Sequence, residues 1–310
     1  LPFLLPIALL AAAYAASASE GALEINQTCA LQTGCFAGDT PGLPVTLTQP
    51  GSYRLTSNLS QALATTNVLQ ISANDVSIDL AGFEISGPFT CPGSPANCIA
   101  AGVGQAIQGV SFTGTRVSNG SVRGTARGLN LGDHCAVDDV RVIETTDFGV
   151  IAGTGCALSR VVVAQNGGDG VLVARGTIVD SAAHDNEING FRFGSNGSIS
   201  NSSAQSNGGN GISAASGSSV DHCVASSNAL SGFAVGIGGV VNSSASYDNT
   251  GIGINGGAGS VVRFSTVYSN GDRGIVLGAG SQAIGNSARF NTGLGLAIGD
   301  NGAYRENVLT

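Results

Sequence analysis

Apolar and polar residues alternate in short runs along most of this chain. Leu129 and Leu131 flank a polar residue, as do Phe191 and Phe193, and each pair follows a glycine. Alternation with a period of two is typical of a short β-strand with one buried face. A Gly/Ser-rich corner follows, and then a second set of apolar positions with the same alternation. The pattern therefore predicts short strands separated by tight corners.

The alternation recurs at a fixed interval of 20 or 21 residues, which two columns of identical residues mark. The glycines are Gly128, Gly149, Gly170, Gly190, Gly211, Gly232, Gly253, Gly274 and Gly295. The asparagines are Asn166, Asn186, Asn207, Asn228, Asn249, Asn270 and Asn291. Asn tolerates the left-handed backbone conformation of a tight corner, and stacked Asn side chains can hydrogen-bond one another as a ladder. We therefore expect one left-handed Asn corner on each coil.

The interval decides the fold class. A βαβ unit needs about 30 residues, so a coil of 21 residues leaves no room for a helix. A leucine-rich repeat needs a Leu-x-x-Leu-x-Leu framework, whereas these core columns hold Val, Ala, Ser and Ile. A calcium-binding nonapeptide roll needs a glycine-rich unit every nine residues. Residues 167–170 resemble one such unit, but this match is isolated. The sequence predicts an all-β, single-stranded, right-handed parallel β-helix, a solenoid with coils of about 21 residues and an Asn ladder.

The period divides the chain into four segments. Residues 128–310 are predicted to form regular β-helix coils, truncated at the C-terminus, and residues 68–127 irregular coils that lead into them. Residues 20–67 would form an N-terminal cap region with loop cysteines. Residues 1–19 form an apolar run that ends in Ala16-Ser17-Ala18, typical of a signal peptide whose basic first part is missing. An apolar strand or buried helix is the alternative for this segment.

Export would permit disulfides, and six of the seven cysteines form candidate pairs. The pairs are Cys29 with Cys35, Cys91 with Cys98, and Cys135 with Cys156. The first two pairs would each close a short loop. The third would join adjacent coils about 4.8 Å apart, within disulfide reach; two buried unbonded thiols are the alternative. Cys223 shares an inward-facing column with Val140 and Val161, and we expect it in the core.

Charge narrows the range of partners. The net charge is −8 and all 12 basic residues are Arg, without a basic patch, so nucleic acid is not an expected partner. An acidic polysaccharide would be repelled over distance, and its binding would need a local Arg cluster or a metal ion. We expect no membrane span after removal of the signal, and a secreted or cell-surface location. The oligomeric state is left open.

Two segments resemble a known family. Residues 74–87 resemble the first coil of the secreted right-handed parallel β-helix proteins of the pectate-lyase-like superfamily, and residues 117–124 resemble the next coil. The likeness runs from about Val68 to the C-terminus and implies the fold, with a site in a groove on an outer sheet. That superfamily contains polysaccharide lyases, hydrolases, uronan epimerases, phage tailspikes and members of no assigned activity, so the resemblance does not imply one activity.

Polar side chains gather on the strand that leads to the Asn ladder. The positions 11, 13 and 15 residues after each repeat glycine should face outward, with one residue fewer in the coil that contains Asp180. The charged ones cluster early: Asp139, Arg141, Arg160, Asp180 and His184. Chemistry on a uronate needs a neutralised carboxylate and proton transfer on the sugar. Arg141 and Arg160 could neutralise the carboxylate, and His184 could be the base. Asp139 and Asp180 could bind substrate or Ca²⁺, or all these charges could form an ion-pair ladder between coils.

The resemblance does not supply a complete mechanism. Enzymes of the pectate-lyase type use several carboxylates for calcium and an Arg or Lys base, and the epimerase type carries Asp-Pro-His-Glu. This chain has no Lys, no such motif and no cluster of three carboxylates, so no metal or cofactor is expected unless it is a lyase that uses Ca²⁺. Tyr247 and Tyr268, on successive coils, could instead carry sugar rings, although Tyr is also favoured as a strand residue.

Three functions remain open. The chain could be a secreted or cell-surface scaffold that binds extracellular polysaccharide without catalysis, a lyase or uronan epimerase that acts on an acidic glycan, or a structural or adhesive surface protein. A low-charge surface rich in Gly, Ser and Asn, without an evident acid–base pair, favours the two functions without catalysis, binding and structural, taken together. Whether the protein is an enzyme is not decided by the sequence.

Overall fold

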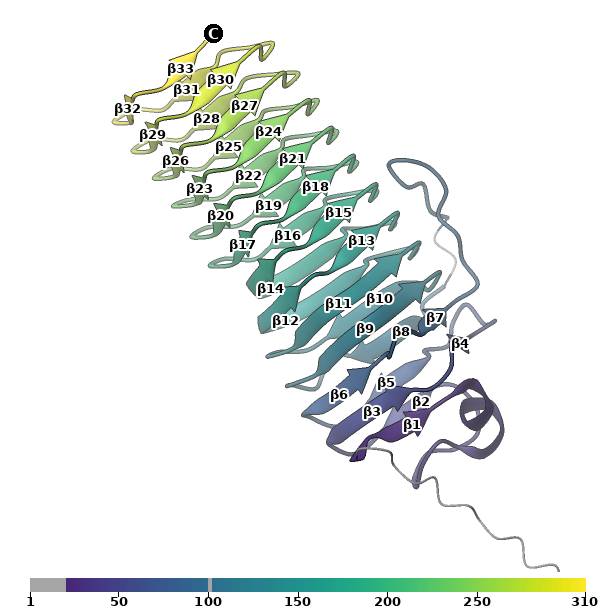
Figure 1. Ribbon diagram of the computed structural model, residues 1–310. Helices are drawn as coiled ribbons and strands as arrows, with labels where there is room; N and C mark the ends of the chain where they lie inside the picture. The colour runs from purple at the N-terminus through teal and green to yellow at the C-terminus, as the bar shows by residue number, and fades with distance from the viewer. Residues whose placement is uncertain (1–20, 100–101) are drawn as a thin grey trace, which may run out of the picture.

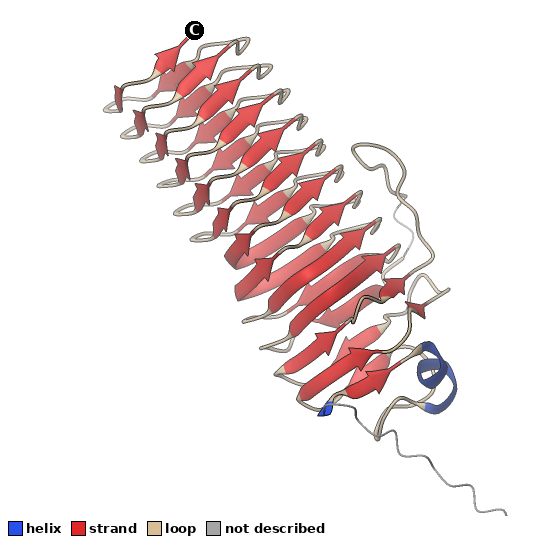
Figure 2. Cartoon of the chain, in the orientation of Figure 1, coloured by secondary structure: helices blue, strands red, loops and turns tan. Residues whose placement is uncertain are grey.

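The protein is an elongated solenoid of parallel β-strands (Figure 1). The computed structural model describes residues 21–99 and 102–310, so the predicted signal peptide lies outside the described residues. The solenoid has about 13 turns, and strands dominate every coil (Figure 2). The prediction of an all-β parallel β-helix is confirmed.

The strands form three stacks, which we call the first, second and third sheets. The first sheet contains β2 (Val45–Leu47), β5 (Leu69–Ile71), β8 (Gln105–Gly109), β10 (Arg127–Leu131), β12 (Val150–Ser159), β14 (Val171–Val179), β16 (Phe191–Phe193), β19 (Ile212–Ala214), β22 (Phe233–Val235), β25 (Ile254–Gly256), β28 (Ile275–Leu277) and β31 (Leu296–Ile298).

The second sheet continues around the corner. It contains β1 (Leu23–Ile25), β3 (Gly51–Leu55), β6 (Val76–Asp79), β9 (Arg116–Arg123), β11 (Ala136–Ile143), the later parts of β12 and β14, β17 (Ser198–Ser200), β20 (Ser219–Asp221), β23 (Val240–Asn242), β26 (Val261–Arg263), β29 (Gln282–Ile284) and β32 (Ala303–Arg305).

The third sheet leads to the Asn ladder. It contains β4 (Leu59–Ser60), β7 (Glu84–Ser86), the later parts of β9 and β11, β13 (Val162–Ala164), β15 (Ala182–His184), β18 (Ser203–Gln205), β21 (Val224–Ser226), β24 (Ala245–Tyr247), β27 (Thr266–Tyr268), β30 (Ser287–Arg289) and β33 (Val308–Leu309).

Parallel pairing already begins at β1, which pairs with β3. The segment 20–67, assigned to a cap by its lack of a period, therefore contributes four strands to the solenoid. Loops of unequal length separate these strands, and this hides the coils from a search for a fixed interval. A short helix, Cys29–Thr33, lies beside these first coils (Figure 2).

All three predicted disulfides are formed, and they lie in the first half of the chain. They join Cys29 to Cys35, Cys91 to Cys98, and Cys135 to Cys156. The last pair links the interiors of two adjacent coils, with 4.5 Å between the Cα atoms. Cys223 is buried and unbonded, as predicted.

The Asn ladder runs through the interior and uses each amide fully. Asn228 Nδ2 donates to Asn249 Oδ1 at 2.8 Å and to the Ala204 carbonyl at 3.1 Å. Asn249 Oδ1 also accepts the backbone N–H of Asn228 at 3.0 Å. Asn207 makes the same contacts with Asn228, so the predicted stacking is confirmed. Since these side chains are buried, each bond replaces one that water can no longer supply.

The left-handed corner is not at the Asn, and that part of the prediction was wrong. The residue before each ladder Asn has the positive φ: 54° at Ser206, 56° at Ser227 and 56° at Asp248. The reason is geometric. The Asn side chain must point inward to reach its neighbours, so the preceding outward residue has to turn the chain.

A second internal polar column was missed. Ser181, Ser202, Ser244 and Ser265 recur with the repeat interval, and Ser202 Oγ accepts the backbone N–H of Ser181 at 3.1 Å. Cys223 occupies one position of this column, where its backbone N–H donates to Ser244 Oγ. Burial raises the pKa of its thiol to about 11, so the buried group stays protonated.

Candidate functional site

Three of the predicted site residues line one shallow hollow on the outer surface. Asp139, Arg141 and Arg160 share it with Asn119 and Gly120, and its volume is about 330 Å³. The hollow lies at the corner between the second and third sheets. It extends from Gly82 across β9 and β11 to the turn between β12 and β13.

A column of left-handed residues builds this corner. Asn119, Asp139 and Arg160 have φ values of 59°, 55° and 50°, and all three are exposed. The sequence analysis placed this column on the flat face of a strand, whereas the structure places it where the chain turns. Gly120 also lines the hollow. No larger residue fits at this position, because a Cβ on Gly120 would lie 2.4 Å from the Leu80 Cβ.

The two arginines of the hollow are in different electrostatic states. Arg160 forms an ion pair with Asp138 on the preceding coil, and Ser159 Oγ donates to the same carboxylate. The ion-pair ladder expected through Asp139 and Asp180 is therefore not formed. Arg160 pairs instead with Asp138, a residue that the sequence did not mark as a candidate. The side chains of Arg141 and Asp139 make no hydrogen bond or ion pair with any described residue. Arg141 thus presents an unused guanidinium that can hold a carboxylate through two parallel hydrogen bonds.

His184 and Asp180 lie outside the hollow. Asp180 occupies the same corner one coil beyond Arg160, with a φ of 51°. His184 Nδ1 lies 2.8 Å from Asp185 Oδ2, and Asp185 Oδ1 accepts a hydrogen bond from Ser94. The carboxylate therefore lies between the hydroxyl and the imidazole, so this set is not a nucleophilic triad, in which the imidazole contacts the hydroxyl. The structure does not bring the predicted base to the two arginines.

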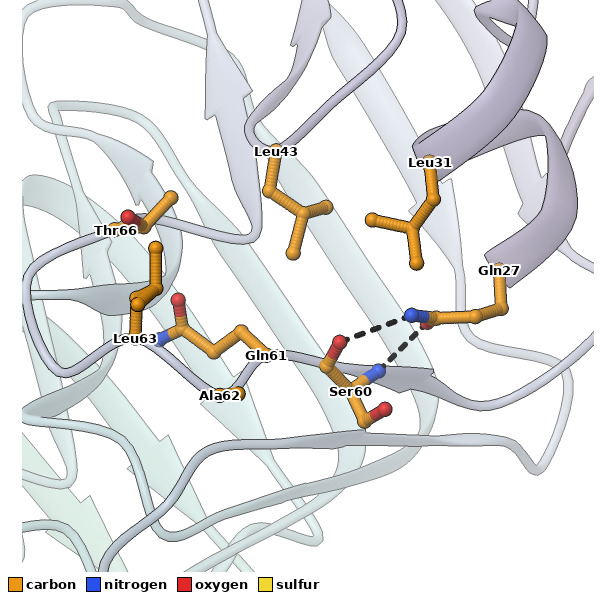
Figure 3. A pocket seen from close by; sticks show the side chains of 8 residues that line it. All are labelled: Gln27, Leu31, Leu43, Ser60, Gln61, Ala62, Leu63 and Thr66. Atoms are coloured by element: carbon orange, nitrogen blue, oxygen red, sulfur yellow. Dashed lines mark hydrogen bonds between the residues drawn. The ribbon is translucent and has the colours of Figure 1, made fainter.

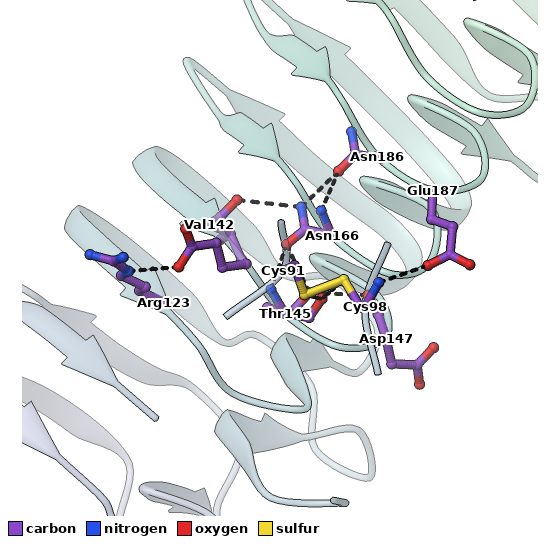
Figure 4. Close-up of a disulfide and its surroundings, with 10 residues drawn as sticks. Cys91, Cys98, Arg123, Val142, Thr145, Asp147, Asn166, Asn186 and Glu187 are labelled. Atoms are coloured by element: carbon purple, nitrogen blue, oxygen red, sulfur yellow. Dashed lines mark hydrogen bonds and ion pairs between the residues drawn. A yellow bond between two sulfur atoms is a disulfide. The ribbon is translucent and has the colours of Figure 1, made fainter. Parts of the chain in front are cut away.

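A disulfide-closed loop covers the corner beside His184. The Cys91–Cys98 disulfide lies against Thr145, near Asn166 and Glu187 (Figure 4). The backbone N–H of Ala96 donates to the Asp185 carbonyl at 2.7 Å. Nothing in the repeat pattern pointed to this contact, because the loop and the corner are far apart in the sequence.

The two predicted tyrosines are neighbours on the third sheet. Tyr247 pairs with Tyr268 in register, and the residues are 39% and 45% exposed. The Tyr268 ring also meets the Phe290 ring edge to face, with 5.4 Å between centroids. We call Tyr247, Tyr268 and Phe290 the aromatic strip. The sequence analysis missed Phe290, which lies at the left-handed corner before Asn291.

Within residues 21–99 and 102–310, no three His, Cys, Asp or Glu side chains gather in a way that could hold a metal ion. In the same residues, no helix has the length and apolar character needed to cross a membrane.

Sequence comparison identifies no relative: no protein family matches the chain, and no curated protein is similar to it. Several solved structures resemble its fold. The Dettilon tailspike protein has a TM-score of 0.58 and 12% identity, covering 83% of this chain and 58% of the tailspike. This chain thus spans little more than half the length of that protein.

Two further structures are more distant. A mannuronan C-5 epimerase module of Azotobacter vinelandii has a TM-score of 0.44 and 14% identity, covering 92% of this chain and 87% of the module. An α-1,3-glucanase of Streptomyces thermodiastaticus has a TM-score of 0.45 and 14% identity, covering 94% of this chain and 70% of the glucanase unit. Likeness at such identities concerns the fold alone. The parallel strand register, together with the likeness to the tailspike, shows that this chain has a parallel β-helix fold.

Proposed function

We propose that this protein is an extracellular or cell-surface scaffold that binds an acidic polysaccharide in the hollow without transforming it. One observation carries the proposal: Arg141 is unpaired and lines the same hollow as Arg160. In a protein with a net charge of −8, the Arg141 guanidinium is a local cation without a carboxylate partner, and it can pair with a carboxylate of an acidic glycan.

The binding chemistry follows from the geometry. A sugar carboxylate would accept two hydrogen bonds from the Arg141 guanidinium, while Arg160 remains paired with Asp138 and forms the side of the hollow. The Asp139 carboxylate can accept hydrogen bonds from sugar hydroxyl groups. Because the hollow is shallow and open, it suits one residue of a long chain that continues over the surface.

The same geometry favours binding over catalysis. Proton abstraction and proton donation on a uronate need two groups beside the sugar ring. The predicted base, His184, contacts Asp185 instead and does not line the hollow. A lyase or epimerase that uses His184 is therefore the less favoured alternative. A role for Ca²⁺, which was expected only with a lyase, is less favoured for the same reason.

The disulfides support the extracellular part of the proposal. Three disulfides in a chain of 310 residues are typical of an oxidising compartment. We infer that the protein works outside the cytosol.

Binding can be tested with calorimetric titration of an oligogalacturonate and of a neutral malto-oligosaccharide. We expect wild type to bind the acidic sugar at low salt and Arg141→Gln to bind it about tenfold more weakly, the scale of one charge-assisted hydrogen bond. Arg289→Gln, which removes an exposed charge elsewhere on the third sheet, is the matched control and should bind like wild type. Equal affinities of the Arg141 and Arg289 variants would overturn the proposal.

Catalysis can be followed in the same samples. Unsaturated products absorb ultraviolet light, and an epimerase would change the uronate composition. If wild type transforms the sugar and His184→Ala does not, the enzyme alternative replaces ours.

A second candidate function rests on the edge-to-face contact of Tyr268 with Phe290. Exposed aromatic rings on successive coils can pack against neutral sugar rings. Binding of the malto-oligosaccharide by wild type and its loss in Tyr268→Ala would support this function. If neither sugar binds, the structural or adhesive interpretation is the one that remains.

A further inference from the structure

A separate pocket lies at the N-terminal end of the solenoid, between the short helix and the turn after β4 (Figure 3). Its volume is about 460 Å³. Leu31, Leu43 and Leu63 form its apolar walls, and none of the residues that line it carries a charge. Such a pocket, within the size range of small-molecule sites, favours a neutral and mainly apolar occupant.

Two glutamines line this pocket, and one of them has its amide fully paired. Gln27 Nε2 donates to the Ser60 carbonyl at 3.0 Å, and Gln27 Oε1 accepts the Ser60 backbone N–H at 2.8 Å. Figure 3 shows both contacts. The Gln27 amide thus donates to and accepts from the backbone of the same residue, Ser60.

The other glutamine, Gln61, has no such partner. Its side chain is 7% exposed, and neither Oε1 nor Nε2 makes a hydrogen bond with any described residue. A buried amide without partners costs free energy, because water no longer satisfies it. In Figure 3 the amide of Gln61 lies among Leu63, Thr66 and Leu43, the side chains that line the pocket.

We propose that this pocket binds a small neutral molecule with an apolar body and a cis-amide edge, that is, an N–H beside a C=O. Such an edge would pair with Nε2 and Oε1 of Gln61 together, as the Ser60 backbone pairs with Gln27. The apolar body would lie against the three leucines. A charged ligand does not fit, because nothing in the lining would balance its charge.

Leu63 controls access to the amide. The amide atoms are covered in the unliganded protein, while the Leu63 side chain beside them is 65% exposed. Rotation of this exposed side chain costs little packing, so Leu63 turns aside when the ligand enters. The site is independent of the glycan hollow, since the two share no lining residue.

Caprolactam is a suitable probe because its ring fixes the amide in the cis form. N-methylcaprolactam has nearly the same apolar surface but lacks the N–H. Both would be titrated into the full protein, with the methyl NMR signals of Leu31, Leu43 and Leu63 as the readout. We expect caprolactam to shift these signals and to bind at least about fivefold more tightly than its N-methyl analogue, the scale of one hydrogen bond.

Variants separate this proposal from simple apolar binding. Gln61→Met keeps the side-chain size and should remove the preference between the two lactams. Gln205→Met, at an exposed strand position, is the matched control and should keep the preference. Arg141→Gln should also keep the preference for caprolactam. Loss of glycan binding in that variant therefore does not affect the test of this pocket. Equal binding of both lactams to wild type, or no shift of the leucine signals, overturns the proposal.

Discussion

The early coils, residues 21–160, and the late coils, residues 161–310, solve the same packing problem in different ways. Leu and Ile fill the early interior, as at Leu55, Leu69 and Ile78, and all three disulfides lie there. In the late coils Ala204 and Ala225 leave room for the buried Asn and Ser columns. The early coils therefore rest on apolar packing and cross-links, and the late coils on repeated internal hydrogen bonds.

This difference also affects the surface. An apolar interior tolerates coils of unequal length, so the early coils can carry the loop that the Cys91–Cys98 disulfide closes, the hollow and the pocket at Gln61. A ladder restricts such changes, because each Asn must meet the next at hydrogen-bond distance; the coil lengths between ladder residues differ by one residue at most. The late coils are consequently regular, and their main surface feature is the aromatic strip.

The largest effect is expected when a ladder residue of the late coils is replaced. Asn228→Leu removes the acceptor of the Asn207 backbone N–H and the donor to the Ala204 carbonyl, both buried. We expect a loss of about 3–5 kcal/mol in the free energy of unfolding, as for several unsatisfied buried groups. Chemical denaturation measures it.

Asn255→Leu is the control for this substitution, because Asn255 is an exposed residue of β25. It should change the free energy of unfolding by less than about 0.5 kcal/mol. Similar losses in the two variants would show that the ladder contributes no special stability.

A somewhat smaller effect is expected from the cross-link of the early coils. Replacing both Cys135 and Cys156 by Ala opens a loop with a sequence separation of 21 residues. The chain-entropy argument gives a loss of about 3 kcal/mol. The same denaturation measurement applies. Cys223→Ser restores the Ser column and should be nearly neutral; a loss as large as that of the double variant would contradict the contrast between the two regions.

The free energy of unfolding should depend on pH through Tyr53, a buried residue of the early coils. Burial raises the pKa of its phenol above the ordinary value of 10.0, and only the protonated phenol can donate its hydrogen bond to the Gln49 carbonyl. The folded protein therefore keeps this proton where the unfolded chain loses it. Stability is fully present below about pH 10 and falls as the pH rises further.

Tyr53→Phe tests this dependence. The variant should lose about 1 kcal/mol near neutral pH, the scale of one hydrogen bond, and should show a weaker decline in stability at alkaline pH. Parallel stability curves for variant and wild type above pH 10 would contradict the assignment.

The smallest effect concerns the thiol of the late coils. Because Cys223 is buried and its pKa is about 11, its thiolate is scarce and inaccessible in the folded protein. Alkylation by iodoacetamide at about pH 8 should leave it unmodified until the protein is unfolded. Mass spectrometry detects the modification, and rapid alkylation of the native protein would show that this column is open.

The same contrast explains what the sequence could and could not predict. The ladder from Asn166 to Asn291 and the Cys135–Cys156 disulfide follow from the interval, because equal spacing places equal residues on neighbouring coils. The sequence does not show which residue turns a corner. For this reason the prediction put the left-handed conformation at the ladder Asn instead of the residue before it, and it did not identify Asp138 as the partner of Arg160.

The candidate sites divide in the same way. Asp139, Arg141 and Arg160 could be grouped because they share two columns on adjacent coils. His184 could not be separated from them, since its contact with Asp185 and the nearby Cys91–Cys98 loop depend on irregular segments. The pocket at Gln61 has no signal in the repeat at all, because its walls come from three segments of the irregular first coils.

The most direct test of the central claim is a crystal structure of the protein with an oligogalacturonate at saturating concentration. The account predicts a sugar carboxylate within hydrogen-bond distance of the Arg141 guanidinium, in the hollow beside Arg160. Sugar bound only at the aromatic strip, with the hollow empty, would contradict it.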